Sequence, residues 1–97
     1  MQSTFWMTAQ ETEDELKRRE LIFPPFPPSL LPEQLYRYDK VERGQVTLTI
    51  ENRHGGVIER KTGKVRDMYK YRQVHYPNAH NYRHHILGED GCPTCED

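Results

Sequence analysis

The last quarter of the chain concentrates side chains that can bind a metal ion. Four of the five histidines and both cysteines lie between residues 75 and 95. Cys92 and Cys95 form a Cys-x2-Cys pair, which commonly supplies two thiolate ligands to zinc. His80 and His84 are four residues apart, so on a helix they project from the same side. The spacing His-x3-His-x7-Cys-x2-Cys therefore predicts a tetrahedral Zn²⁺ site made of these four side chains.

Other residues of this segment offer alternative ligands. His85 could take the place of His84, and His75 is a further imidazole candidate. Glu89 and Asp90 could supply oxygen ligands. The competing interpretation is an exposed polar tail with ordinary surface histidines. Two imidazoles and two thiolates would fill a zinc coordination sphere, so the pattern indicates a structural rather than a catalytic metal.

The Cys-x2-Cys pair does not have the context of a redox motif. Thioredoxin-type cysteines react because the first of them lies at a helix N-terminus, which lowers the thiol pKa. Only two residues follow Cys95, so we expect no helix there. The rest of the sequence assembles no nucleophile, base and oxyanion donor. We therefore expect a protein that is not an enzyme and has no small-molecule substrate.

The composition indicates a thin hydrophobic core. The chain has 97 residues, of which 34% are hydrophobic and 30% charged, and the mean hydropathy is -1.00. Small chains with so little apolar surface usually depend on a metal, disulfides or a partner for stability. Fourteen basic residues nearly balance 15 acidic ones, so no overall polyelectrolyte role is indicated. A protein partner within a larger assembly is the interpretation that we favour.

A helix is predicted over about residues 9–20. Thr8 and Glu11 have the spacing of a capping box, in which each side chain accepts a hydrogen bond from the backbone N–H of the other. Basic residues fill the last turn, where they suit the helix dipole. The helix has little apolar surface of its own beyond Ala9 and Leu16. We therefore expect the hydrophobic residues at its two ends to anchor it.

A proline-rich segment follows, LIFPPFPPSLLPEQLYRY. Its prolines exclude helix and favour an extended polyproline II arm, on which Phe23 and Phe26 share one edge. The arm is either a partner-binding ligand or a spacer that packs on its own domain. Pro32 is a good first residue for one or two helical turns. The residues predicted to contact a partner are Phe5, Trp6, Phe23 and Phe26.

The middle of the chain predicts a small antiparallel sheet. Val46, Leu48 and Ile50 alternate with polar residues, which is typical of a strand with one buried face. The residues NRHGG predict a turn and VIERK a second strand. A turn at residues 62–64 would lead to a third strand at VRDMYKYRQVHY. Asn78 could cap a helix over AHNYRHHIL, ended by Gly88.

These elements define the predicted architecture. The fold class is α+β, with a small antiparallel β-meander, a short C-terminal helix and a zinc knuckle, preceded by an N-terminal helix and a proline-rich extended arm. We divide the chain into residues 1–40, the helix and arm, and residues 41–97, the sheet domain with its metal site.

The basic segment 53–72 suggests an alternative function. On a sheet face, its cations and tyrosines could combine phosphate contacts with base stacking in a zinc-containing nucleic-acid-binding protein. A solvated sheet face explains the same pattern, because the net charge is near zero. The residues concerned are Arg53, Arg60, Lys61, Lys64, Arg66, Tyr69, Lys70, Tyr71 and Arg72.

The sequence also bears on the compartment. No apolar run is long enough to span a bilayer, and the first 20 residues lack the pattern of a secretion signal. With two cysteines and no export signal, we expect an intracellular, reducing compartment, cytoplasm or nucleus, in which free thiolates are available as ligands.

Overall fold

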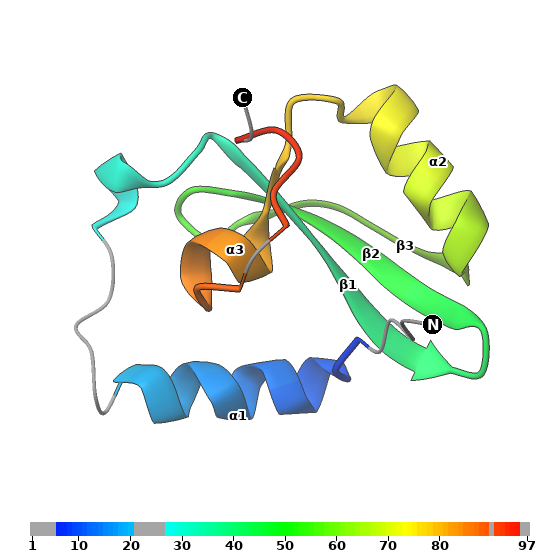
Figure 1. Cartoon of the computed structure of the whole chain (residues 1–97), viewed down its shortest axis with the longest axis horizontal. Coiled ribbons are helices and arrows are strands. Elements are labelled where there is room, and N and C mark those ends of the chain that lie inside the picture. Colours follow the sequence, from blue (N-terminus) through cyan, green and yellow to red (C-terminus); the bar gives the residue numbers. More distant parts are fainter. Residues whose placement is uncertain (1–5, 21–26, 90, 96–97) are drawn as a thin grey trace.

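A computed structural model describes residues 6–20, 27–89 and 91–95 (Figure 1). The fold is mixed α+β, with a four-stranded sheet and helices on both of its faces. The elements in chain order are α1 (Ala9–Glu20), the 3₁₀ helix η1 (Pro28–Leu30), β1 (Gln34–Glu42), β2 (Gln45–Asn52), β3 (Val57–Lys64), α2 (Val65–His75), β4 (His80–Asn81) and α3 (Tyr82–Ile86). None of the described helices combines the length and apolar character needed to cross a membrane.

The sheet has the strand order β3-β2-β1-β4. The first three strands form an antiparallel meander, which is the type of sheet that the sequence predicts. The strand β4 pairs with β1 in parallel, through Leu35–His80 and Tyr36–Asn81. Gly44, with φ of 72°, connects β1 to β2, and Gly55, with φ of 87°, connects β2 to β3. The pairing of β4 with β1 places the C-terminal segment beside a strand that lies much earlier in the sequence.

One face of the sheet carries the hydrophobic core. Residues directly opposite each other on antiparallel strands share a face, and the pairs Tyr36–Ile50 and Tyr38–Leu48 therefore point to the same side. α2 covers this side and buries Met68, whose methyl group lies against Gly63 of β3. The core consists of Tyr36, Tyr38, Val46, Leu48, Ile50, Met68 and Ala79.

The other face is polar and carries buried charges under α1 and α3. Asp39 accepts hydrogen bonds from Arg37 at 2.8 Å and from Arg83 at 3.4 Å. The Thr12 hydroxyl of α1 lies 3.3 Å from the same carboxylate, and the Arg37 guanidinium lies over the ring of Tyr82. Figure 1 shows α1 and α2 on opposite sides of the sheet. A polar network thus links two helices to β1.

The N-terminal helix begins as the sequence predicts. The Thr8 N–H donates to the Glu11 carboxylate at 2.8 Å, and the Glu11 N–H donates to the Thr8 hydroxyl at 3.1 Å. Both halves of the capping box are therefore formed. Just before the helix, the Lys40 N–H donates to the Met7 carbonyl at 2.9 Å, so the chain entering α1 is paired with the edge of β1.

Several predicted elements differ from the structure, among them the C-terminal helix, which begins at Tyr82 after the strand β4. Residues after Pro32 form β1 rather than a helix, because Leu35, Tyr36 and Tyr38 are buried by pairing with β2. Residues 62–64 continue β3 instead of turning. The predicted third strand is the helix α2, whose buried residues Met68 and Arg72 have helical spacing. The tyrosines of this segment favoured a strand, and helical packing on the sheet outweighed that preference.

The predicted division at residues 40 and 41 falls inside β1, which pairs along its length with β2. The proline-rich arm lies partly at residues 21–26, outside the described residues. The part that is described ends in η1, where Leu30 is 69% exposed.

Candidate metal centre

Four side chains that can ligate a metal converge at the end of the sheet beside β4. They are His80 of β4, His85 of α3, and Cys92 and Cys95 of the loop that follows α3. His80 is placed by the parallel pairing of β4 with β1. His85 is placed by the start of α3, where the Asn81 side chain accepts a hydrogen bond from the Arg83 N–H at 2.9 Å.

The four ligand atoms are close enough together to surround one ion, although the two nitrogen–sulfur distances of Cys95 are shorter than those of an ideal tetrahedral zinc sphere. Zn–N bonds of about 2.05 Å and Zn–S bonds of about 2.3 Å imply N–N separations of about 3.3 Å and N–S separations of about 3.6 Å. His80 Nδ1 and His85 Nε2 are 3.3 Å apart. The Cys95 Sγ lies 2.9 Å and 3.1 Å from these nitrogens, and the Cys92 Sγ lies 3.6 Å and 3.9 Å from them. The four atoms can therefore share one ion.

Backbone contacts hold the cysteine loop in place. The Asn81 N–H donates to the Cys92 Sγ at 3.3 Å, and the Cys95 N–H donates to the Cys92 carbonyl at 3.1 Å, closing a tight turn. The Thr94 hydroxyl donates to the Ala79 carbonyl at 2.9 Å. In metal sites, hydrogen bonds from surrounding residues fix the orientation of the ligands. The bonds to the cysteine loop would orient the two thiols in the same way.

The imidazoles of the cluster favour the neutral form. Burial lowers the pKa of His80, and the charge of His84 lowers it further. Burial also lowers the pKa of His85, with smaller contributions from the two neighbouring histidines. Because only the neutral imidazole can ligate a metal, these shifts favour binding near neutral pH.

The cluster contains His85 in the position that the sequence analysis gave to His84. His84 instead directs its Nδ1 to the Glu89 carbonyl, at 2.8 Å. The expectation of His84 required residues 80 and 84 to lie on one helix. His80 belongs to β4 and the helix begins only at Tyr82, so the four-residue periodicity does not apply.

Of the three remaining alternative ligands, the two that the structure describes lie elsewhere. His75 ends α2 and stacks with Tyr71 at a centroid distance of 4.3 Å. Glu89 follows α3, where its N–H donates to the Arg83 carbonyl at 3.0 Å. Neither residue belongs to the group that the structure brings together, and Asp90 lies outside the described residues.

The predicted partner-binding residues are only partly described. Trp6 is half-buried and packs against Tyr38 and Tyr69, each at a centroid distance of 5.5 Å. Its ring is therefore engaged with the core of its own chain. Phe5, Phe23 and Phe26 lie outside the described residues.

The residues proposed for nucleic-acid binding do not share one face. Arg60 and Lys61 are neighbours on β3 and point to opposite sides of the sheet. The Tyr71 hydroxyl donates to Glu59 at 2.6 Å, and Arg72 is buried over the ring of Tyr36. Exposed cations remain on β3 and α2, namely Arg60, Lys61, Lys64, Arg66 and Lys70.

Sequence reasoning did not identify the residues that support the site. Asn81 caps α3 and contacts the cysteine loop through both its backbone and its side chain. Its position just before a short helix is a usable capping signal, but the predicted cap was Asn78. Thr94 also supports the site, through its hydrogen bond to the Ala79 carbonyl. Its bond to Ala79 depends on tertiary placement and has no local signal.

Comparison with known proteins adds no relative: no family model matches the chain, and neither curated proteins nor solved structures gave a match. The functional argument therefore rests on the geometry of the chain itself.

Proposed function

We propose that this protein is a small, non-enzymatic zinc-binding subunit that docks on a larger protein assembly. The observation that carries the zinc assignment is the convergence of His80, His85, Cys92 and Cys95, whose ligand atoms all lie within 4.8 Å of one another. Two thiolates and two imidazoles are a donor set that selects zinc over hard cations.

The metal has a structural role in this proposal. A catalytic zinc keeps an open position for water or substrate, whereas four protein ligands complete the tetrahedron. The ligands come from β4, α3 and the loop 91–95, three short segments that one ion would tie together. Because the ligands are placed only when the chain folds, the free energy of zinc binding contributes to folding.

Native mass spectrometry of matched variants tests the ligand set. We expect one zinc per wild-type chain, lost in Cys92→Ser and in His85→Ala. His84→Ala is the matched control, because it removes the adjacent imidazole, which lies outside the cluster, and should retain the zinc. Wild-type protein without zinc, or His85→Ala that retains it while His84→Ala loses it, would refute this site.

The docking part of the proposal rests on surface that the domain leaves uncovered. Leu30, within the proline-rich segment, is 69% exposed. The preceding residues include Phe23 and Phe26, and aromatic anchors contribute much of the binding energy at protein interfaces. We propose that this arm binds the partner, with α1 beside it.

Affinity purification from the native source tests the docking. We expect a Phe23→Ser/Phe26→Ser variant to lose the proteins that copurify with the wild type, with its zinc content and melting temperature unchanged. Leu16→Ser, on α1, serves as a comparison outside the arm. If the same proteins copurify with the wild type and with the double variant, the proposal that the arm is the docking site is wrong.

A further inference from the structure

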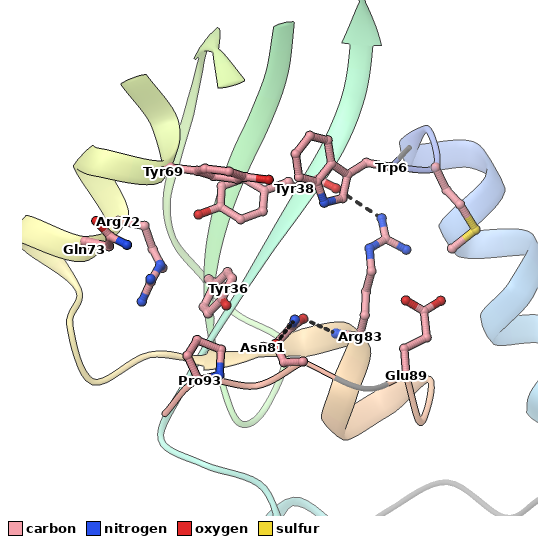
Figure 2. Close-up of a pocket in the computed structure, with 12 residues that line it drawn as sticks. Trp6, Tyr36, Tyr38, Tyr69, Arg72, Gln73, Asn81, Arg83, Glu89 and Pro93 are labelled. Carbon is pink, nitrogen blue, oxygen red and sulfur yellow. Dashed lines mark hydrogen bonds between the residues drawn. The ribbon is translucent and has the colours of Figure 1, made fainter. Parts of the chain in front are cut away.

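A cleft of about 430 Å³ lies beside β1, and Gly91 and Pro93, the sequence neighbours of Cys92, line one side of it (Figure 2). α2 forms one wall, and β4 with the loop around Gly91 and Pro93 forms another. The volume is in the range of small-molecule sites, which are typically concave and partly aromatic. Its aromatic lining residues are Trp6, Tyr36, Tyr38 and Tyr69.

The aromatic side chains form a contiguous surface. Trp6 packs against both Tyr38 and Tyr69, and these two tyrosines are 5.0 Å apart between ring centroids. Figure 2 shows the three rings grouped at one end of the cleft. A planar ring could add to this group by stacking or edge contacts, the arrangements that aromatic pairs prefer.

A buried cation lies next to this aromatic group. Arg72 is 8% exposed, and its guanidinium carbon lies 4.5 Å from the centroid of the Tyr36 ring. No ion pair among the described residues includes Arg72, and no acceptor among them bonds its Nε. A buried charge without a counter-charge is costly, because its hydration is lost without compensation.

The charge of Arg83, the second arginine of the cleft, is partly compensated by carboxylates of the same chain. Arg83 is 6% exposed, but its Nη2 lies 3.4 Å from Asp39 and 3.1 Å from the Tyr38 carbonyl. Glu89 also lines the cleft and acts on Arg83 by its negative charge. Excess positive charge is therefore concentrated at Arg72, and Glu89 disfavours ligands with several negative groups.

We propose that this cleft binds a small aromatic anion, with its phosphate or carboxylate group at Arg72 and its planar ring against Trp6, Tyr38 and Tyr69. Arg72 already hydrogen-bonds to the side chain of Tyr38; the anion would add the counter-charge and an acceptor for its Nε. The ring would extend the aromatic group and bury additional apolar surface. None of the four candidate metal ligands lines the cleft, although the cleft residue Asn81 donates its N–H to the Cys92 Sγ.

A titration of the full-length protein can test this ligand class. Trp6 is the single tryptophan, so its indole N–H signal in NMR spectra reports on the cleft. The probes are adenosine 5′-monophosphate and phenylacetate, with adenosine and inorganic phosphate as controls that lack the anion or the ring. We expect saturable shifts with at least one of the two aromatic anions, and binding at least about ten-fold weaker for both controls.

Saturation by only one aromatic anion would identify phosphate or carboxylate as the preferred group. Two results would overturn the proposal: no saturable shift with either aromatic anion, or equal affinity for adenosine and adenosine 5′-monophosphate. The latter would mean that Arg72 does not select an anion.

Variants separate a binding role of Arg72 from a structural one. Arg72→Gln should weaken binding of the preferred probe about ten-fold or more, while Arg66→Gln, an exposed position on the same helix, should leave it unchanged. Without ligand, Arg72→Gln should melt no lower than the wild type, because a buried unpaired charge is removed. Should this variant fail to fold, Tyr69→Ala at the aromatic wall provides the second test and should weaken binding several-fold. Unchanged affinity in the folded variants would exclude the site.

Discussion

The two faces of the sheet are stabilised by different physical interactions. On the α2 face, Leu48 and Ile50 are at most 1% exposed, and apolar burial dominates. The face under α1 and α3 instead buries Asp39, whose carboxylate forms ion pairs with Arg37 and Arg83. The four side chains that could hold a metal ion lie at the end of the sheet, where α3 and the cysteine loop meet β4.

The difference shows how a chain with little apolar sequence can cover both faces of a sheet. Apolar burial contributes roughly 25 cal/mol per Å² and requires no particular geometry. A buried charge network requires complete pairing, because a missing partner leaves an uncompensated charge. α3 has only five residues, so it needs other ties to the sheet. We infer that the Asp39 network and the metal centre supply them.

Removing the metal should have the largest effect and should distinguish the two faces. Chelation is expected to destabilise the protein by more than about 5 kcal/mol and to lower the Tm by about 20 °C or more. Hydrogen exchange should show protection lost first in β4, α3 and residues 91–95, and last in β2. A zinc-free chain with unchanged exchange in α3 would contradict a structural role for the metal.

Asp39→Asn should have the next largest effect. The change removes the carboxylate that neutralises Arg37 and Arg83, and loss of one partner from a buried ion pair costs about 3–5 kcal/mol. Urea denaturation measures this loss. Glu15→Gln is the control, because Glu15 pairs with Arg18 at the surface, where such pairs contribute about 0–1 kcal/mol. Equal effects of the two substitutions would mean that the polar face is not held by its charges.

Leu48→Ala tests the apolar face. Leu48 is 1% exposed, and deletion of a buried leucine side chain costs about 3 kcal/mol through lost burial and the cavity that remains. Unlike the effect of Asp39→Asn, this loss should not change with ionic strength, because no charge is involved. Urea denaturation at low and high salt therefore compares the two faces directly, and a salt-dependent effect of Leu48→Ala would contradict the distinction.

Elements with local signals were predictable from the sequence. The helix over residues 9–20 follows from a capping box formed entirely within four residues, and the strand at residues 45–52 follows from an alternation that needs no distant partner. The segment 65–75 was misjudged because its tyrosines favour strands. Its helical nature depends on Met68 packing against Gly63 of β3.

The metal site was predictable in its location and only partly in its ligands. The Cys-x2-Cys pair and the group of histidines identify the segment. The choice between His84 and His85 depends on whether residue 80 is helical, and this is decided by pairing with Leu35, forty-five residues earlier in the chain. Likewise, the buried Arg72 was counted among the candidate nucleic-acid-binding residues, because burial of a single cation within a basic segment has no sequence signal.

The smallest effect is expected at Glu59, an acidic residue at the rim of the apolar face. Hydrogen bonds from Tyr71 and then Tyr76 lower the pKa of Glu59, and the bond to Glu59 raises the pKa of Tyr76 to about 12. A carboxyl group whose pKa is lowered by folding contributes stability above its unfolded pKa and loses it as the pH falls through the folded value. The contribution of Glu59 should therefore disappear below its ordinary pKa of 4.5.

Tyr71→Phe/Tyr76→Phe should raise the pKa of Glu59 toward this ordinary value, as followed by NMR of the side-chain carboxyl carbon against pH. Tyr69→Phe is the control, because the bonds to Glu59 come from the other two hydroxyls. At neutral pH the Tm should change far less than with Leu48→Ala, since the phenyl rings are retained and only two partly buried hydrogen bonds are lost. An unchanged Glu59 pKa in the double variant would mean that these bonds do not form in solution. A Tm loss comparable to that of Leu48→Ala would mean instead that the apolar face, like the polar one, depends on hydrogen bonds to a charged group.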